Sequence, residues 1–156
     1  MSEKTNAIRL IQQAKLVYRE ASYAYDESDL SGIHAAEAIS MPPEQVFKTL
    51  VARGDRTGIN VFCIPVCCEL DLKKAAKVSN NKRVEMVTVK ELLPITGYIR
   101  GGCSPIGMKK HYPTYFDETC ILWDEIAVSA GARGHQILMR PEHLVDFVQG
   151  IVVDLT

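Results

Sequence analysis

The chain has 156 residues, of which 47% are hydrophobic, and a formal net charge of −1 at pH 7. This length and composition predict a single globular domain over residues 1–156 with a buried core. The near-zero charge excludes a basic field over the whole molecule, so any contact with RNA must come from a local patch. No apolar run approaches a membrane span, and the N-terminal MSEKTNAIRL lacks the apolar stretch of a signal peptide. We therefore expect no membrane association and a cytoplasmic location.

The first predicted element is an N-terminal helix. Thr5 or Asn6 is placed to cap it, and Leu10, Ala14 and Val17 follow at the spacing of one helix face. We therefore expect these three apolar side chains to pack against the core.

Short elements alternate through the middle of the chain. Pro43 suits the first turn of a short helix. Two apolar runs separated by the turn-like RGDRTG predict a β-hairpin. In chain order, the pattern predicts a strand at 20–25, a helix at 32–39, hairpin strands at 47–52 and 59–65, a helix capped by Asp71 and running through Val78, and a helix at 88–93 that Pro94 ends.

The C-terminal third is predicted to hold four strands and a last helix. Pro141 opens this helix, on which four apolar residues line up as one face: Leu144, Phe147, Val148 and Ile151. The strands are expected at 114–116, 120–122, 126–128 and 136–139. Many short strands with peripheral helices predict an α+β fold, in the form of a partly closed mixed barrel.

Two glycine-rich segments and one lysine indicate a binding site. The segment TGYIRGGCSPIG, Thr96–Gly107, predicts a strand that enters a tight loop, whose glycines let the backbone turn its amides toward a ligand. A second loop of small residues, SAGARG, covers Ser129–Gly134. Lys48 lies inside the apolar run QVFKTLV, which leaves two interpretations. It occupies the outward face of a half-buried strand, or it is aimed into a pocket as a point charge for a phosphate or a developing oxyanion. Thr49 adds a hydroxyl that we expect on the other face.

The motifs of metal, nucleotide and triad chemistry are missing from the sequence. The four histidines show no HExxH spacing, and neither a P-loop nor a GxSxG motif occurs. We therefore expect no metal and no cofactor. Five cysteines form no disulfide framework and suit buried, reduced side chains: Cys63, Cys67, Cys68, Cys103 and Cys120.

Four segments together resemble the YbaK/EbsC family of aminoacyl-tRNA deacylases. They are QVFKTLV, LDLKKAAK followed by VEM, TGYIRGGCSPIGMKK and VSAGARG, and their order and spacing match along nearly the whole chain. The resemblance implies a mixed β-barrel-like sheet surrounded by helices, the fold of the editing domain of prolyl-tRNA synthetases. It also implies the removal of cysteine from mischarged Cys-tRNA(Pro), with aminoacyl-tRNA as substrate and prolyl-tRNA synthetase as a partner.

The resemblance also implies roles for individual residues. The family's essential lysine matches Lys48 and the threonine after it matches Thr49. The tyrosine of the first strand matches Tyr23, with Tyr25 as the alternative. The other matching positions lie in the two loops: Gly101, Gly102 and Ser129.

Two positions depart from the family pattern. Gln136 stands where the YbaK branch often has aspartate, so a role that needs a carboxylate base is in doubt. Cys103 stands where an aliphatic residue is common. We count Gln136, Cys103 and the adjacent Ser104 as substrate-binding positions.

The resemblance implies a mechanism that needs no catalytic triad. The thiol of the cysteinyl ester attacks its own carbonyl and releases a cyclic thiolactone. Amides near Gly101–Cys103 are expected to hold the oxyanion, while Lys48 anchors the terminal phosphate or ribose. Two alternatives remain: a deacylase for another small aminoacyl group such as Ala-tRNA(Pro), and a non-catalytic module that binds tRNA or a synthetase.

RNA contact requires a basic surface. Lys73, Lys74 and Lys77 are predicted on one face of their helix. They are candidates for acceptor-stem phosphates, and a merely solvated helix face is the alternative.

Overall fold

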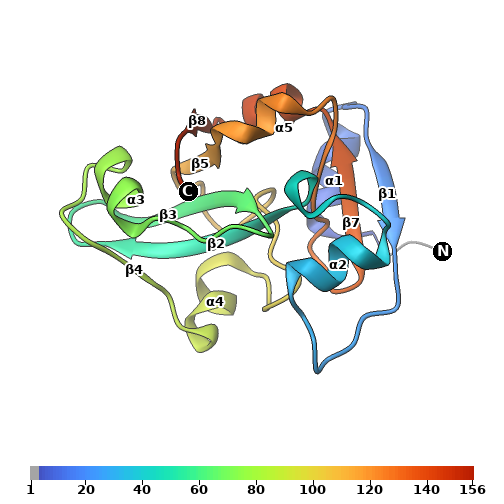
Figure 1. Cartoon of the computed structure of the whole chain (residues 1–156), viewed down its shortest axis with the longest axis horizontal. Helices are drawn as coiled ribbons and strands as arrows, with labels where there is room; N and C mark the ends of the chain where they lie inside the picture. The colour runs from blue at the N-terminus through green and yellow to red at the C-terminus, as the bar shows by residue number, and fades with distance from the viewer. Residues whose placement is uncertain (1–3) are drawn as a thin grey trace.

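The computed structural model describes residues 4–156 and folds into two sheets with helices around them (Figure 1). One sheet has three strands in the order β1-β7-β6, and the other has five in the order β4-β2-β3-β5-β8. The helical segments are α1 (Asn6–Gln13), α2 (Gly32–Ala38), η1 (Pro43–Gln45), α3 (Leu72–Val78), α4 (Val89–Thr96), η2 (Glu118–Leu122) and α5 (Pro141–Phe147). The strands are β1 (Arg19–Ser22), β2 (Phe47–Gly54), β3 (Gly58–Pro65), β4 (Val84–Met86), β5 (Thr114–Asp117), β6 (Ile126–Ser129), β7 (His135–Met139) and β8 (Ile151–Val153).

A backbone bridge joins the two sheets. Val46, at the start of the β2–β3 hairpin, pairs in parallel with Ala127 of β6. The hairpin is antiparallel, whereas β3 with β5 and β5 with β8 are parallel pairs. Mixed pairing across two joined sheets gives the α+β, barrel-like architecture that the sequence predicted.

The main core lies between the sheets. It takes buried side chains from both of them, such as Val61 and Phe116 of one and Ile126 and Ile137 of the other, and α1 contributes Ile8. Burial of this apolar surface is the main stabilising term of such a fold. The core therefore holds the two sheets together and fixes how the loops between them meet.

Alternation along the hairpin directs neighbouring side chains to two layers. Val51 packs into the main core, while Ala52 packs with Phe62 and Ile64 against Ala75 of α3. Successive side chains of a strand point to opposite faces, so α3 covers the outer face of the hairpin.

The predicted face of the first helix is wrong in part. Thr5 caps α1 as expected, but the buried face consists of Ala7, Ile8 and Ile11. Leu10 packs against the core only partly, and Val17 lies beyond the helix with 76% of its surface exposed. The helix ends after two turns, which is too early for the predicted face to extend to Val17.

The helix around Pro94 is longer than predicted. It begins at a capping box formed by Thr88 and Glu91 and ends at Gly97, whose φ of 89° gives a left-handed cap. These two caps set its length, and Pro94 sits inside it at the expense of one backbone hydrogen bond. Thr96 is therefore helical, and no strand enters the glycine-rich loop.

The expected strand at 120–122 is also wrong. Asp117 accepts hydrogen bonds from the N–H and the hydroxyl of Thr119, which turns the chain into the 3₁₀ helix η2 directly after β5. The apolar side chains of Ile121 and Leu122 point to solvent. Ile151, placed by its pattern in the last helix, belongs instead to β8, because α5 ends at Phe147.

Candidate functional site

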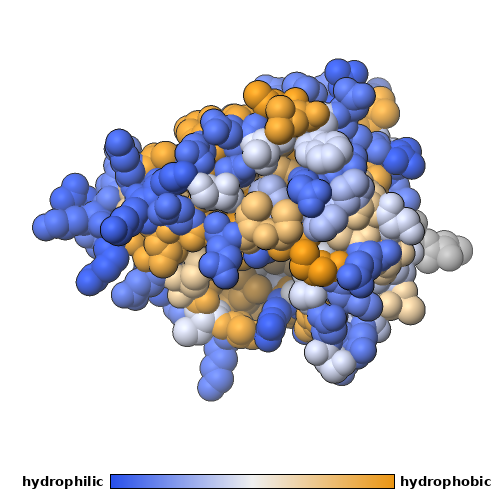
Figure 2. All heavy atoms as spheres, viewed as in Figure 1, coloured by the Kyte–Doolittle hydropathy of each residue, from blue (hydrophilic) through white to orange (hydrophobic). Residues whose placement is uncertain are grey.

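A cavity of about 490 Å³ opens where β2, α2, α4 and the two glycine-rich loops meet. Figure 2 shows apolar side chains in a recess between the regions that Figure 1 labels α4 and α2, with hydrophilic residues around it. Seven of the predicted site residues line this cavity: Tyr23, Lys48, Thr49, Gly101, Cys103, Ser129 and Gln136. Their roles stay predictions.

The floor of the cavity is an open edge of β2. On this side, Val46 just before β2 is bridged to β6, and β2 is paired with β4 from Ala52 onward; no described strand pairs with this edge between these points. The carbonyl of Val51 points to this edge, where it accepts from the N–H of Val87 at 3.1 Å. Backbone groups of alternate residues in an antiparallel strand point the same way, so those of Thr49 also face the cavity.

Lys48 and Thr49 lie on opposite faces of β2. Thr49 stands opposite Cys63, a core residue, and their Oγ1 and Sγ atoms are 3.9 Å apart. Lys48 stands opposite Ile64, on the face that α3 covers. Both reach the cavity because it runs along the edge of the strand. Lys48 is half-buried: it lies on the outer face of the strand, as one interpretation of its sequence context held, and it also lines the cavity, as the other held.

The glycine-rich loop contains a tight turn at the cavity wall. The N–H of Gly102 donates to the carbonyl of Ile99 at 2.9 Å, and Gly101 has a φ of 85°, as the third residue of a type II turn requires. A Cβ on Gly102 would lie 3.1 Å from the backbone of Ala132 and Arg133. Gly102 thus permits close contact between the two loops, and its amide is already used within the turn.

An arginine side chain ties the same two loops together. The Nε of Arg133 donates to the carbonyl of Arg100 at 2.9 Å. Arg100 itself lines the cavity and is exposed. It brings a second positive charge to the cavity beside Lys48. No sequence signal singled out Arg100 as a site residue, although it lies within the TGYIRGG segment that carried the resemblance.

Three polar side chains gather at the wall formed by β6 and β7. Ser129 and Gln136 are direct cross-strand partners, and the Ser129 Oγ accepts from the N–H of Gly131 at 3.1 Å. Burial raises the pKa of Tyr23, and a hydrogen bond from the Gln136 side chain opposes this rise. The Oε1 atom of Gln136 is buried and has no hydrogen-bond partner within residues 4–156.

Cys103 is the cysteine that lines the cavity. Burial raises the pKa of its thiol to about 12, against a smaller opposing effect of a hydrogen bond with Thr96. A thiol with this pKa stays protonated near neutral pH, and the thiolate is the nucleophilic form. The site therefore does not activate Cys103 as a nucleophile.

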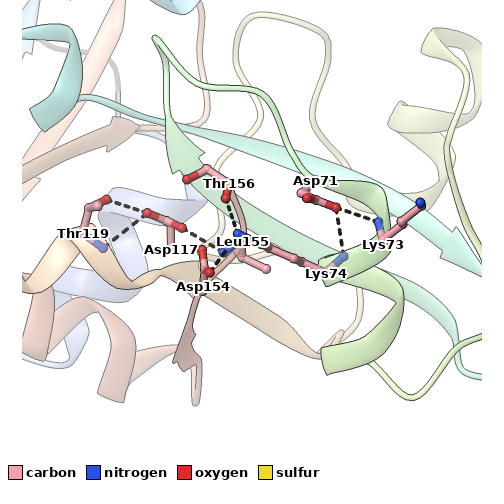
Figure 3. A network of polar contacts seen from close by, with 8 residues as sticks. All are labelled: Asp71, Lys73, Lys74, Asp117, Thr119, Asp154, Leu155 and Thr156. Carbon is pink, nitrogen blue, oxygen red and sulfur yellow. Dashed lines mark hydrogen bonds and ion pairs between the residues drawn. The ribbon is translucent and has the colours of Figure 1, made fainter.

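The remaining predicted residues do not line the cavity: Gly102, Ser104, Lys73, Lys74 and Lys77. Ser104 is fully buried and accepts from the N–H of Ile106 at 3.2 Å, which is a structural contact. In Figure 3, Lys74 reaches the C-terminal segment, where its Nζ donates to Asp154 at 2.8 Å and to the carbonyl of Thr156 at 2.5 Å. The hydrogen bond from Lys74 holds the pKa of Asp154 below its usual value.

The three lysines of α3 therefore differ. Lys73 and Lys77 are exposed, whereas Lys74 is partly buried and engaged in an ion pair. Asp71 caps the helix by accepting from the N–H groups of Lys73 and Lys74 (Figure 3). Only two of the three side chains are thus available for a partner.

Two further findings concern metal binding and membrane spanning in the described chain. Within residues 4–156, no three His, Cys, Asp or Glu side chains gather closely enough to hold a metal ion. No helix in this part of the chain has the length and apolar character needed to cross a membrane.

Comparison with known proteins assigns the family. Residues 31–147 match the aminoacyl-tRNA editing domain. The chain belongs to this family. It is 48% identical over 154 residues to EbsC of Enterococcus faecalis, named as a proposed Cys-tRNA(Pro)/Cys-tRNA(Cys) deacylase, and the match covers 99% of this chain and 94% of that one.

Solved structures share the fold of this editing domain. A proposed trans-editing enzyme for prolyl-tRNA synthetase aligns with a TM-score of 0.82 and 25% identity, covering 99% of both chains. A hypothetical protein aligns with a TM-score of 0.87 and 18% identity, covering 97% of this chain and 99% of that one. The second likeness concerns the fold alone.

Proposed function

We propose that the protein is a trans-editing deacylase that clears cysteine from mischarged Cys-tRNA(Pro), acting in the cytoplasm beside prolyl-tRNA synthetase. The activity named for the Enterococcus relative supports the substrate, and the trans-editing enzyme with the same fold supports the partner. Proteins need such second sieves because one methylene in a binding pocket gives only about 1–3 kcal/mol of discrimination.

The observation that carries the mechanism is the protonation state of Cys103, whose thiol lines the cavity. The Cys103 thiol has a pKa of about 12, whereas an ordinary cysteine thiol has a pKa near 8.5. At neutral pH, a thiol with this ordinary pKa is ionised to a far greater extent than Cys103. The substrate brings a better nucleophile than the described site offers.

Release then follows from the substrate's own thiolate. Sulfur attacks the ester carbonyl carbon, so a C–S bond forms and the ester C–O bond breaks. The ribose oxygen leaves and takes up the proton that the thiol lost. The products are a cyclic thiolactone and tRNA with a free terminal hydroxyl. Holding thiol and ester in contact supplies the large effective concentration of an intramolecular reaction.

The cavity offers means to stabilise the developing oxyanion. Lys48 and Arg100 contribute positive charge, and the amides of Gly101 and Cys103 are free of backbone partners within the described chain. The backbone N–H of Thr49 points to the same cavity from the open strand edge. Positioned donors of this kind raise the rate of acyl transfer, typically by a factor of about 10²–10³ for each donor.

A deacylation assay across four substrates tests the proposal. Cys-, Ser-, Ala- and Pro-tRNA(Pro) are compared, together with Cys-tRNA(Pro) whose thiol has been alkylated. We expect rapid release of cysteine, slow release of serine and none from the alkylated ester. Equal rates for cysteine and serine would point to an enzyme-activated water. Fastest release of alanine would indicate the sister activity, and no release from any ester would indicate a binding module.

A further inference from the structure

The side chain of Gln136 carries a hydrogen-bond acceptor that the protein leaves unused. Only 6% of the residue is exposed, and its Oε1 atom has no partner among the described residues. The Gln136 side chain lies close enough to Tyr23 to lower the pKa of that hydroxyl by hydrogen bonding. A buried carbonyl without a donor is destabilising, so such groups in cavities are typically completed by water or a ligand.

The charges around the cavity indicate what kind of donor completes it. The charged side chains that line it are Lys48 and Arg100, and no Asp or Glu of the described chain lines it. An ammonium group bound against Gln136 would have no counter-charge there and two positive neighbours. Enclosing an unpaired charge is strongly unfavourable. The acceptor therefore suits a neutral donor.

Ser129 supplies the complementary group beside this acceptor. It is the direct cross-strand partner of Gln136, and side chains of such a pair lie on the same face about 5 Å apart at their Cβ atoms. Its Oγ already accepts from Gly131, which leaves its own proton to donate. A carbonyl acceptor next to a hydroxyl donor is complementary to one alcohol group, which both donates and accepts.

We propose that Gln136 and Ser129 bind the free vicinal hydroxyl of the terminal ribose, next to the esterified oxygen. This inference rests on the proposed function, because an acylated ribose is the substrate it names. The ribose hydroxyl is a strong neutral donor, whereas the thiol of the amino acid is a weak one. Recognition of this hydroxyl distinguishes RNA from DNA at a given position. In this chain, the neutral amide of Gln136 takes the hydroxyl without adding a charge to the cavity.

The test measures binding, so that it does not depend on turnover. Two stable analogues carry cysteine in amide linkage on the terminal adenosine of an acceptor-stem RNA, one with the vicinal hydroxyl and one with hydrogen in its place. Their affinities are measured by calorimetry for the wild type and for Gln136→Met, Gln136→Glu and Ser129→Ala. Methionine keeps the length of glutamine but lacks the acceptor, while glutamate keeps an acceptor at the same place.

We expect the wild type to prefer the hydroxyl analogue by about tenfold to a hundredfold. Gln136→Met should bind both analogues alike, Ser129→Ala should show a reduced preference, and Gln136→Glu should retain it. Wild-type preference in the methionine variant, or equal affinities in the wild type, would overturn the inference. Absence of binding to both analogues would also overturn it.

A third analogue tests whether the Gln136 acceptor binds the ammonium group of the substrate instead of the ribose hydroxyl. It lacks the amino group of cysteine and keeps the ribose hydroxyl. If Gln136→Met abolished discrimination against this analogue and left the hydroxyl preference intact, the acceptor would bind the ammonium group and the inference would be wrong. The deacylation assay decides the proposed function independently, since an active enzyme with no hydroxyl preference refutes only the present inference.

Discussion

Removing the charge of Lys48 should abolish most activity without unfolding the protein. The side chain is half-buried at the open edge of β2 and makes no ion pair within the described chain. Lys48→Met keeps the aliphatic stem that covers the strand edge. We therefore expect the free energy of unfolding to change by no more than about 0.5 kcal/mol, as for surface positions without special contacts.

The effect on catalysis should be much larger. A positive charge aimed at a developing oxyanion or a phosphate typically contributes a factor of about 10²–10³ to the rate. Single-turnover deacylation of Cys-tRNA(Pro) measures this loss, and urea unfolding checks the fold. Lys73→Met is the matched control, because Lys73 is exposed on α3 and does not line the cavity. Near-normal turnover by folded Lys48→Met would remove this lysine from the site.

Three further substitutions test other parts of the site. Gly101→Ala should lower the unfolding free energy by about 1–2 kcal/mol, because alanine is strained at a φ of 85°, and urea titration would show an unchanged midpoint if this were wrong. Cys103→Val should retain activity with an unchanged pH–rate profile below about pH 9, because a thiol with a pKa of about 12 is protonated throughout; trapping an acyl group on Cys103 would contradict this. Asp117→Ala should destabilise the protein by about 1–3 kcal/mol, because the buried N–H of Leu155 loses its acceptor, and an unchanged thermal midpoint would refute that role.

Local signals in the sequence predicted an element correctly where a single residue determines the backbone conformation. Asp71 caps α3 by accepting two backbone N–H bonds, and the turn after Arg53 closes the predicted hairpin. The predictions failed where distant contacts decide. β8 is a strand only because β5 offers it an edge, and η2 forms because Asp117 turns the chain. Neither effect is visible in the periodicity of the residues concerned.

The candidate site also has features that the sequence predicts and features that depend on distant contacts. Lys48 and Thr49 could be found because a polar pair interrupts an apolar strand, but the open edge beneath them depends on where β4 and β6 stop pairing with β2. The glycine-rich loop was recognised from its composition. That the Gly102 amide is used inside the turn, while Gly101 lines the cavity, follows only from the geometry.

The dependence of tRNA affinity on salt should show which lysines meet RNA. If Lys48 and Arg100 alone contact phosphates of the single-stranded end, two contacts at about −0.7 each give a slope of log K against log salt of about −1.4. If Lys73 and Lys77 of α3 also contact the acceptor stem, two duplex contacts at about −0.9 each would steepen it to about −3.2. We expect the shallow slope, because none of the residues of α3 lines the cavity. Titration of the stable analogue at several salt concentrations measures it, with Lys73→Met/Lys77→Met as the comparison. A steep slope that this double variant flattens would place the RNA across α3 and refute the reasoning.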